Sequence, residues 1–344
     1  MKARWIKHTL QFKTPGGTSR GILTTKESWF LILESPLKKG IGECGLLKGL
    51  SCDPIADYED VLDTICSNIN TGIFPDPKEF KAYPSIRMGL EMAYRSYQSE
   101  DPMVLYPSDF TSGKKQLPIN GLIWMGSVDY MQQQIEAKLN EGYTCIKMKI
   151  GTLDFQQEFQ LLKALRNRFS EDRLTLRVDA NGAYSLDQAQ HVLEALSKIN
   201  VHSIEQPIAA GQSDAMAQLC AHTPVPIALD EALIGWHRLE EKAALLDQIR
   251  PQYIILKPSL LGGFAAAEEW IDLAKNNNID WWVTSALESN IGLNAIAQWT
   301  ATLQANGPQG LGTGSLFTNN FSGPLTLKNG YIRHANAPKW EIPF

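Results

Sequence analysis

Apolar runs and helical stretches alternate along the last two thirds of the chain. Segments between the apolar runs carry helix signals: 129–142 ends in a glycine suited to a C-cap, and 185–200 begins with a serine suited to an N-cap. The strand-like runs number eight, at residues 117–124, 144–150, 174–180, 201–205, 226–232, 253–259, 280–286 and 310–314. Strands that alternate with helices predict a parallel sheet, and eight such units predict a closed (β/α)8-type barrel.

An open, doubly wound sheet is the alternative α/β fold for this pattern. That fold usually carries a glycine-rich phosphate loop after its first strand. The sequence MGSVDYM follows the first strand-like run here and contains no GxGxxG. The barrel is therefore the favoured interpretation.

The N-terminal part of the chain has a different, mixed pattern. Residues 5–12 and 28–35 have the pattern of strands, and a loop at 13–21 with turn chemistry separates them. Helical patterns follow within 54–98. We therefore expect an α+β domain over 1–112, the barrel over 113–318, and a closing segment, 319–344, that returns to the N-terminal domain.

Composition narrows the class of protein further. The 344 residues are 44 % hydrophobic and carry a net charge of −5 without any basic block, so neither nucleic acid nor an anionic membrane is an expected partner. The start lacks the apolar core of a signal peptide, and no run approaches the ~18 apolar residues of a membrane span. We expect a cytoplasmic protein with reduced cysteines, because the five cysteines form no CxxC pair.

Acidic residues stand at the ends of three successive predicted strands. Asp179, Glu205 and Asp230 are 26 and 25 residues apart, which is one strand–helix unit each time. Lysines occupy the equivalent places on the strands before and after them, at Lys149 and Lys257. A single acid at a strand end is usually a helix cap or a solvated rim residue. Five residues of these types at one-unit spacing instead predict a shared site at the barrel mouth.

Three adjacent carboxylates repel one another unless a cation holds them. The six histidines are scattered, so a metal here would be held by oxygen ligands, which favours Mg²⁺, with Mn²⁺ as the alternative ion. The lysines fall on the second and sixth strands, on opposite sides of the mouth. Lys147 has the same orientation as Lys149, one layer deeper. Because a neighbouring ammonium and a metal both disfavour charge on Lys149, this lysine can act as a general base.

The sequences KMKIG, RVDAN, SIEQP, ALDEA and ILKPS resemble those of the enolase superfamily, in its muconate-cycloisomerase-like branch. The resemblance implies a modified (β/α)7β barrel with an α+β capping domain, whose mobile loop is 13–21. It also implies that Asp179, Glu205 and Asp230 bind Mg²⁺ while Lys149 and Lys257 flank the substrate. The shared chemistry is removal of a proton α to a carboxylate, through an enediolate intermediate.

Within that branch, SALES and GLGTGSLFTNN resemble the o-succinylbenzoate synthases. The resemblance implies a hydro-lyase of menaquinone biosynthesis that dehydrates 2-succinyl-6-hydroxy-2,4-cyclohexadiene-1-carboxylate to 2-succinylbenzoate. We expect Lys147, Arg20, Asn181 and Ser285 to contact this small dicarboxylate. Dipeptide epimerases carry Asp-x-Asp on the last strand, whereas residues 312–315 here contain no acid, which favours an anionic substrate.

Two other functions stay open at this point. N-succinylamino acid racemase or dipeptide epimerase activity would use the same lysines within the same superfamily. A non-catalytic barrel that binds a metal would belong to another class, and the five filled positions argue against it. The sequence carries no signal for an oligomeric state.

Overall fold

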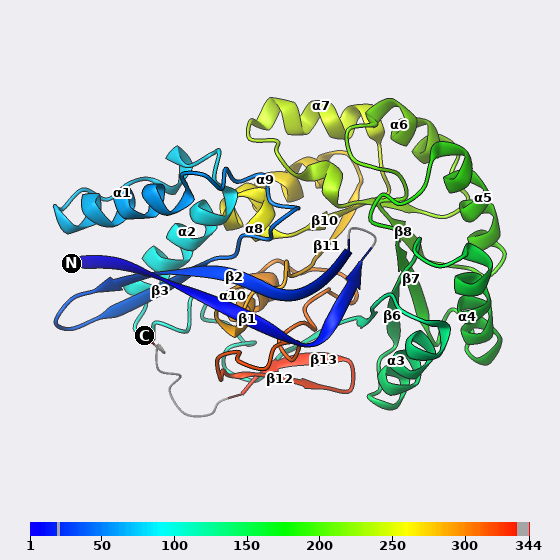
Figure 1. Ribbon diagram of the computed structural model, residues 1–344, viewed down its shortest axis with the longest axis horizontal. Coiled ribbons are helices and arrows are strands. Elements are labelled where there is room, and N and C mark those ends of the chain that lie inside the picture. Colours follow the sequence, from blue (N-terminus) through cyan, green and yellow to red (C-terminus); the bar gives the residue numbers. More distant parts are fainter. Residues whose placement is uncertain (19–20, 336–343) are drawn as a thin grey trace.

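The computed structural model describes residues 1–18, 21–335 and 344 (Figure 1). Its N-terminal part is an antiparallel sheet in the order β1-β2-β3, covered by helices. The bounds are β1 (Lys2–Thr18), β2 (Gly21–Glu34), β3 (Lys39–Cys44), α1 (Tyr58–Asn70), the 3-10 helix η1 (Pro77–Glu79) and α2 (Pro84–Gln98). Both predicted strands are present, and helices lie within 54–98 as predicted.

Glycines allow α2 to pack directly on β3. A Cβ atom added to Gly42 would lie 1.8 Å from the carbonyl oxygen of Gly89, and one added to Gly89 would lie 2.3 Å from the sulfur of Cys44. No side chain fits in either place. The helix and strand backbones therefore meet at a distance that only glycine permits.

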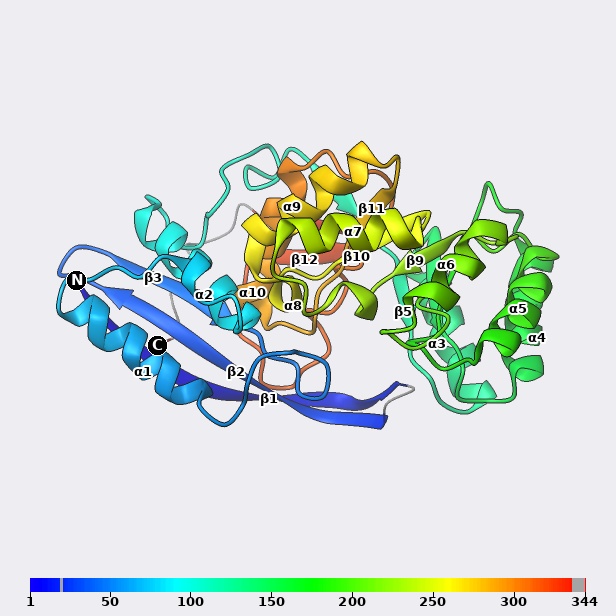
Figure 2. The ribbon, with the colours of Figure 1, turned by 90° about the horizontal axis from the view of Figure 1, so that it is seen from above.

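The remainder of the chain builds a curled parallel sheet of seven strands in the order β11-β10-β9-β8-β7-β6-β5. Helices follow the strands and cover the outside of the sheet (Figures 1 and 2). The strands are β5 (Gly121–Ile123), β6 (Cys145–Lys149), β7 (Thr175–Asp179), β8 (Ser203–Glu205), β9 (Ile227–Leu229), β10 (Tyr253–Leu256) and β11 (Asp280–Val283). The helices are α3 (Val128–Asn140), α4 (Phe155–Arg168), α5 (Leu186–Ser197), α6 (Ser213–His222), η2 (Glu231–Leu233), α7 (Leu239–Ile249), α8 (Pro258–Leu261), α9 (Gly263–Asn276) and α10 (Asn290–Thr302).

The eighth predicted strand closes the barrel but is much shorter than expected. Residue pairs Thr284–Gly310 and Ile119–Gln309 are isolated parallel bridges, so residues 309–310 join the end of β11 to the start of β5. The prediction of a regular strand over 310–314 is wrong beyond Gly310. Glycine has little strand propensity, and three glycines in this segment weaken the pairing.

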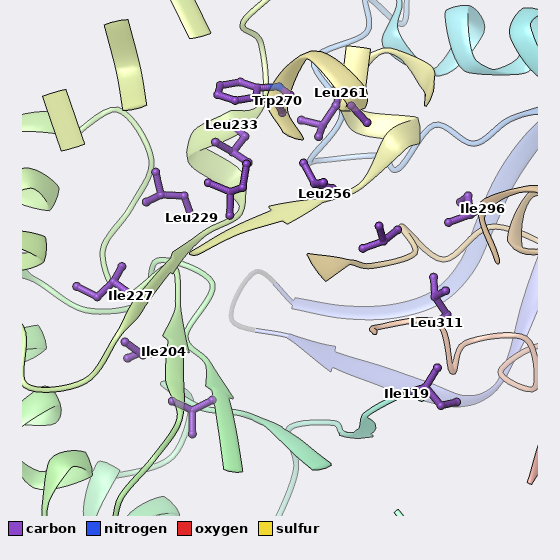
Figure 3. Packing of buried hydrophobic residues seen from close by; sticks show 14 of the residues in the cluster. Ile119, Ile204, Ile227, Leu229, Leu233, Leu256, Leu261, Trp270, Ile296 and Leu311 are labelled. Carbon is purple, nitrogen blue, oxygen red and sulfur yellow. The ribbon is translucent and has the colours of Figure 1, made fainter. Parts of the chain in front are cut away.

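Strand residues alternate between the barrel interior and the helices. Those facing the helices are apolar and fully buried, as Ile204, Leu229 and Leu256 are, and they form one core with helix residues such as Trp270 (Figure 3). The interior positions carry the polar residues Asp179 and Glu205 instead. This division explains the near-continuous apolar runs of the sequence and the charges within them.

The hairpin β1–β2 reaches from the capping part across the mouth of the barrel (Figure 2). The loop predicted at 13–21 is largely strand, because β1 extends to Thr18 and β2 begins at Gly21. The backbone N–H of Lys13 donates to the carbonyl of Leu316 (2.8 Å), and that of Thr318 donates to Gln11 (2.8 Å). These bonds fasten the hairpin to the segment that follows the closing strand.

A third, antiparallel sheet has the order β12-β13-β4 and joins the segment before the first barrel strand to residues near the end of the chain. Its strands are β4 (Gln116–Pro118), β12 (Leu325–Lys328) and β13 (Tyr331–His334). The ring of Phe344 lies 5.2 Å from that of Phe30 in the capping sheet. The domain boundaries at 112 and 318 stay a prediction. None of the helices in the part of the chain that the structure describes has both the length and the hydropathy of a membrane span.

Candidate active site

The strand register brings Lys149, Asp179 and Glu205 to one level of the barrel. Lys149 pairs with Asp179 across β6 and β7, and Asp179 pairs with Glu205 across β7 and β8. Glu205 pairs with Ala228 on β9, so Asp230 stands two residues further along its strand. This stagger is the shear that a closed barrel requires.

Lys147 lies between two of the carboxylates. Its ammonium is 2.9 Å from Oδ2 of Asp179 and 2.5 Å from Oε2 of Glu205. All three side chains are buried. Burial alone would lower the pKa of Lys147, but the charges of Asp179 and Glu205 outweigh it and raise the pKa above its ordinary value. The lysine therefore stays charged and holds the two acids together.

Lys149 stands above Lys147 and shares one of its partners. Its ammonium donates to Oδ2 of Asp179 at 3.0 Å and to Oδ1 of Asn181 at 2.6 Å. Asn181 in turn donates from Nδ2 to Glu231 at 2.9 Å. Burial would raise the pKa of Asp179, but Lys147 and Lys149 lower it well below its ordinary range. The amine is thus oriented by an aspartate and an amide.

Lys257, the other lysine predicted to flank the substrate, lies on the opposite side of the mouth from Lys149. Lys257 donates to Oδ2 of Asp230, and its ammonium lies 3.9 Å from Oε1 of Glu205. Gln206 fixes the backbone around Asp230, because its Oε1 accepts from the N–H groups of Asp230 and Ala232, each at 3.1 Å. Three carboxylates and three ammonium groups therefore alternate through the site.

The donor set has the chemistry of a site for a hard metal ion. Asp179, Glu205 and Asp230 offer carboxylate oxygens, and Oε1 of Glu205 is buried without a hydrogen-bond donor among the described residues. Ammonium groups stand between the acids, and no cluster of three or more His, Cys, Asp or Glu side chains in metal-binding geometry occurs in residues 1–18, 21–335 and 344. The residues fit Mg²⁺ by their chemistry.

A cavity of about 330 Å³ opens above and beside these residues. It is lined by Lys147, Lys149, Asp179, Asn181, Lys257 and Ser285. Ser285 is hydrogen-bonded to Thr313, hydroxyl to hydroxyl, at 2.5 Å. Glu205 and Asp230 lie behind the ammonium groups that they bind. Arg20, the remaining predicted contact, lies outside the described residues.

The capping part contributes to the same cavity. Leu23 of β2, Lys13 of β1 and the loop residues Leu47 and Leu50 line it. A Cβ on Gly16 would lie 3.1 Å from the ring of Trp124, so the hairpin tip packs against this tryptophan. The Lys149 ammonium lies 5.9 Å from the centre of the same ring. The hairpin and Trp124 together cover the candidate base.

Sequence reasoning missed several of these groups. It did not name Glu231 as a site residue, although this carboxylate accepts a hydrogen bond from Asn181. It did not single out Gln206 or Trp124. Trp124 ends the first predicted strand, so the strand-end rule that found the acids could have found it. Gln206 carries no charge and gives no such signal.

The chain belongs to the enolase superfamily. The family model described as "Enolase C-terminal domain-like" matches residues 130–338, which is more than half of the chain. Members of this superfamily are in general Mg²⁺-dependent enzymes.

Within that class, the chain is 46 % identical to o-succinylbenzoate synthase of Desulfotalea psychrophila, over 96 % of this chain and 98 % of the relative. The crystal structure of MenC from Desulfotalea psychrophila LSv54 superimposes with a TM-score of 0.86 at 43 % identity, covering 97 % and 99 % of the two chains. An N-succinylamino acid racemase of Amycolatopsis is 26 % identical over 81 % of this chain and 76 % of its own.

Proposed function

We propose that the protein dehydrates 2-succinyl-6-hydroxy-2,4-cyclohexadiene-1-carboxylate to 2-succinylbenzoate, as a Mg²⁺-dependent hydro-lyase of menaquinone biosynthesis. The observation that carries the proposal is that Lys149 and Lys257 line one cavity with Asp179, and that Glu205 and Asp230 lie next to the same ammonium groups. The similarity to o-succinylbenzoate synthase over nearly the whole chain supports the choice of reaction.

Asp179, Glu205 and Asp230 would hold the metal. Bound Mg²⁺ would neutralise the negative charge that develops on the substrate carboxylate when the neighbouring carbon loses its proton. The charges of the site favour the binding of a cation. The site is neutral while Lys147, Lys149 and Lys257 are all protonated, and the base form of Lys149 leaves one net negative charge, which attracts a cation.

Lys149 would take the proton α to the carboxylate. Asp179 and Asn181 orient its amine toward the cavity, and Trp124 shields it from bulk water. The same amine, once protonated, would return the proton to the departing hydroxyl, so that water leaves. Lys257 would stay charged and stabilise the substrate anion from the opposite side. The aromatic product makes this elimination favourable.

The remaining predicted contacts would orient the substrate. Lys147, Asn181 and Ser285 lie on the cavity wall, and Arg20 would meet the second carboxylate of the succinyl group. Residues 312–315, Gly-Thr-Gly-Ser, offer no acid to pair with the amino group of a dipeptide. The lack of an acid at these positions agrees with an anionic, doubly carboxylated substrate.

The test is an assay of the purified protein with Mg²⁺ and the cyclohexadiene substrate. We expect Lys149→Ala to lower turnover by about 10²–10⁴-fold, the usual contribution of a general acid–base group, with an unchanged circular dichroism spectrum. Lys163→Ala is the matched control, because Lys163 is exposed on α4. Near-native turnover in the Lys149 variant would reject the mechanism.

Racemisation of N-succinylamino acids is the second candidate, since it requires a base on each face of the substrate and two lysines flank this cavity. Incubation in D₂O separates the two reactions. A racemase exchanges the α-proton of both enantiomers through two different lysines, whereas a dehydratase releases water from the cyclohexadiene. Rapid exchange with no dehydration would favour the racemase.

A further inference from the structure

The cavity continues away from the carboxylates, toward the seam where residues 309–310 close the barrel. In the order of the strands this seam lies opposite β8, which carries Glu205. Asn120, Tyr143 and Gly312 line the cavity there. A Cβ atom added to Gly312 would lie 3.6 Å from the backbone oxygen of Asn120 and 4.0 Å from the hydroxyl of Tyr143. The three residues thus surround one point.

Two polar side chains at this point have no hydrogen-bond partner in the described part of the chain. Asn120 is 4 % exposed and Tyr143 is 6 % exposed, and neither side chain forms a hydrogen bond to any described residue. Oδ1 of Asn120 is buried and receives no hydrogen bond from any described residue, whereas Tyr143 lines the cavity. Tyr58, by contrast, is also buried and bonds to Ser85 at 2.6 Å. Buried polar groups are rarely left unpaired, because each costs free energy unless something binds it.

The chemistry of the pair suits an oxygen acceptor. Burial raises the pKa of Tyr143 to about 12, so its hydroxyl is a donor at neutral pH. The amide of Asn120 both donates and accepts. Gly312 has a negative φ and leaves free space beside both groups, where any longer side chain would fill the cavity.

We propose that Asn120 and Tyr143, beside Gly312, form a subsite that hydrogen-bonds the oxygen atoms of the substrate's oxo-acid side arm. The inference rests on the proposed function and specifies its substrate class: a ring carboxylate held near Asp179, Glu205 and Asp230, with an arm that carries a carbonyl or carboxylate toward the barrel seam. No other assignment uses these two polar groups.

The test measures binding of three ligands to the full-length protein with Mg²⁺, by tryptophan fluorescence or calorimetry. 2-Succinylbenzoate has the whole arm, 2-butanoylbenzoate has the carbonyl alone, and benzoate has no arm. We expect Tyr143→Phe and Asn120→Ala each to weaken the binding of 2-succinylbenzoate by about five- to tenfold, which is the effect of one lost hydrogen bond. The affinity for benzoate should change by less than about twofold. The response of 2-butanoylbenzoate assigns the bond to the carbonyl or to the terminal carboxylate.

Stability separates a binding role from a structural one. Tyr143→Phe removes an unpartnered hydroxyl, so its melting temperature should match that of the native protein. Tyr94→Phe is the matched control: Tyr94 donates to the carbonyl of Pro75 at 3.0 Å, far from the cavity, so its loss should lower stability and leave binding unchanged. Gly312→Ala should keep the fold and weaken the binding of only those ligands that have an arm.

If Tyr143→Phe and Asn120→Ala both bind 2-succinylbenzoate as the native protein does, the subsite is overturned while the proposed function stays intact. An equal loss of affinity for benzoate has the same consequence. A native protein that folds but neither binds 2-succinylbenzoate nor dehydrates the cyclohexadiene would overturn both.

Discussion

Glu43, in the capping sheet, caps a helix of the barrel by binding Ser289. Its carboxylate accepts from the backbone N–H of Ser289 at 3.0 Å and from the hydroxyl at 2.5 Å, and it also accepts from Gly292 at 2.9 Å. Glu43 is fully buried, and so is the adjoining Glu288, whose carboxylate accepts from the N–H of Ala286 on the cavity wall. A negative charge at a helix N-terminus is favourable, and here it joins the two parts of the molecule.

Glu43→Ala should therefore destabilise the whole chain. The substitution leaves buried N–H groups at the start of α10 without an acceptor and removes the ion pair with Lys26, whose ammonium is 3.9 Å away. We expect a loss of about 3–5 kcal/mol in the free energy of unfolding, measured with urea. Glu27→Ala removes a half-exposed pair with Lys7 and should cost less than about 1 kcal/mol. Similar losses in the two variants would contradict the capping role.

Removal of Lys147 should make the fold depend on magnesium. Lys147→Met takes away the ammonium between Asp179 and Glu205 and leaves two buried, adjacent carboxylates. We expect the free energy of unfolding without metal to fall by about 3–5 kcal/mol, and Mg²⁺ to raise the melting temperature more in this variant than in the native protein. An equal rise in both proteins would argue that these acids do not hold the ion. Lys163→Met serves as the control.

Asp53 should make stability depend on pH. Burial raises its pKa from 3.8 to about 6, although Ser85 opposes this by donating to Oδ1 from its N–H (3.0 Å) and its hydroxyl (2.6 Å). The folded state thus binds the proton more tightly than the unfolded chain. The stability from this group is fully present below pH 3.8 and is lost as the pH rises through about 6. Asp53→Asn keeps the acceptor and cannot ionise.

The difference in unfolding free energy between Asp53→Asn and the native protein should therefore grow in favour of the variant, by about 2 kcal/mol between pH 4 and pH 7. Denaturant titrations at several pH values measure it, and all other titrating groups cancel in the comparison. A difference that is constant with pH would show that the pKa of Asp53 is not raised.

Gly42→Ala should disrupt the capping domain. The new methyl group would overlap the carbonyl of Gly89, and neither backbone can move without separating α2 from β3. We expect a loss of more than about 3 kcal/mol, because overpacking against backbone is less easily relieved than against a side chain. Gly312→Ala, whose methyl group meets nothing within 3.6 Å, should lose much less. Thermal unfolding of the two variants provides the comparison.

Many residues of the candidate site could be predicted from the spacing of charged residues in the sequence. Asp179, Glu205 and Asp230, with Lys149 and Lys257, were found because parallel strands end at one face of a barrel and a charge at such an end is visible in the sequence. The helix starts were equally readable: Ser185 caps α5 and forms a capping box with Gln188, as its position predicted. Asn120 and Tyr143 gave no such signal, since a neutral residue just before a strand is compatible with many environments.

The sequence by itself determined the alternation of strands and helices, the barrel that follows from it, and the level at which the charged residues lie, because these depend on local periodicity and on chain connectivity. Tertiary structure alone decided how those charges pair, with Lys147 between two acids and Glu43 on the helix that begins beside Ser289. Such pairings join residues 30 to 246 positions apart. They depend on side-chain directions and burial, which no local pattern encodes.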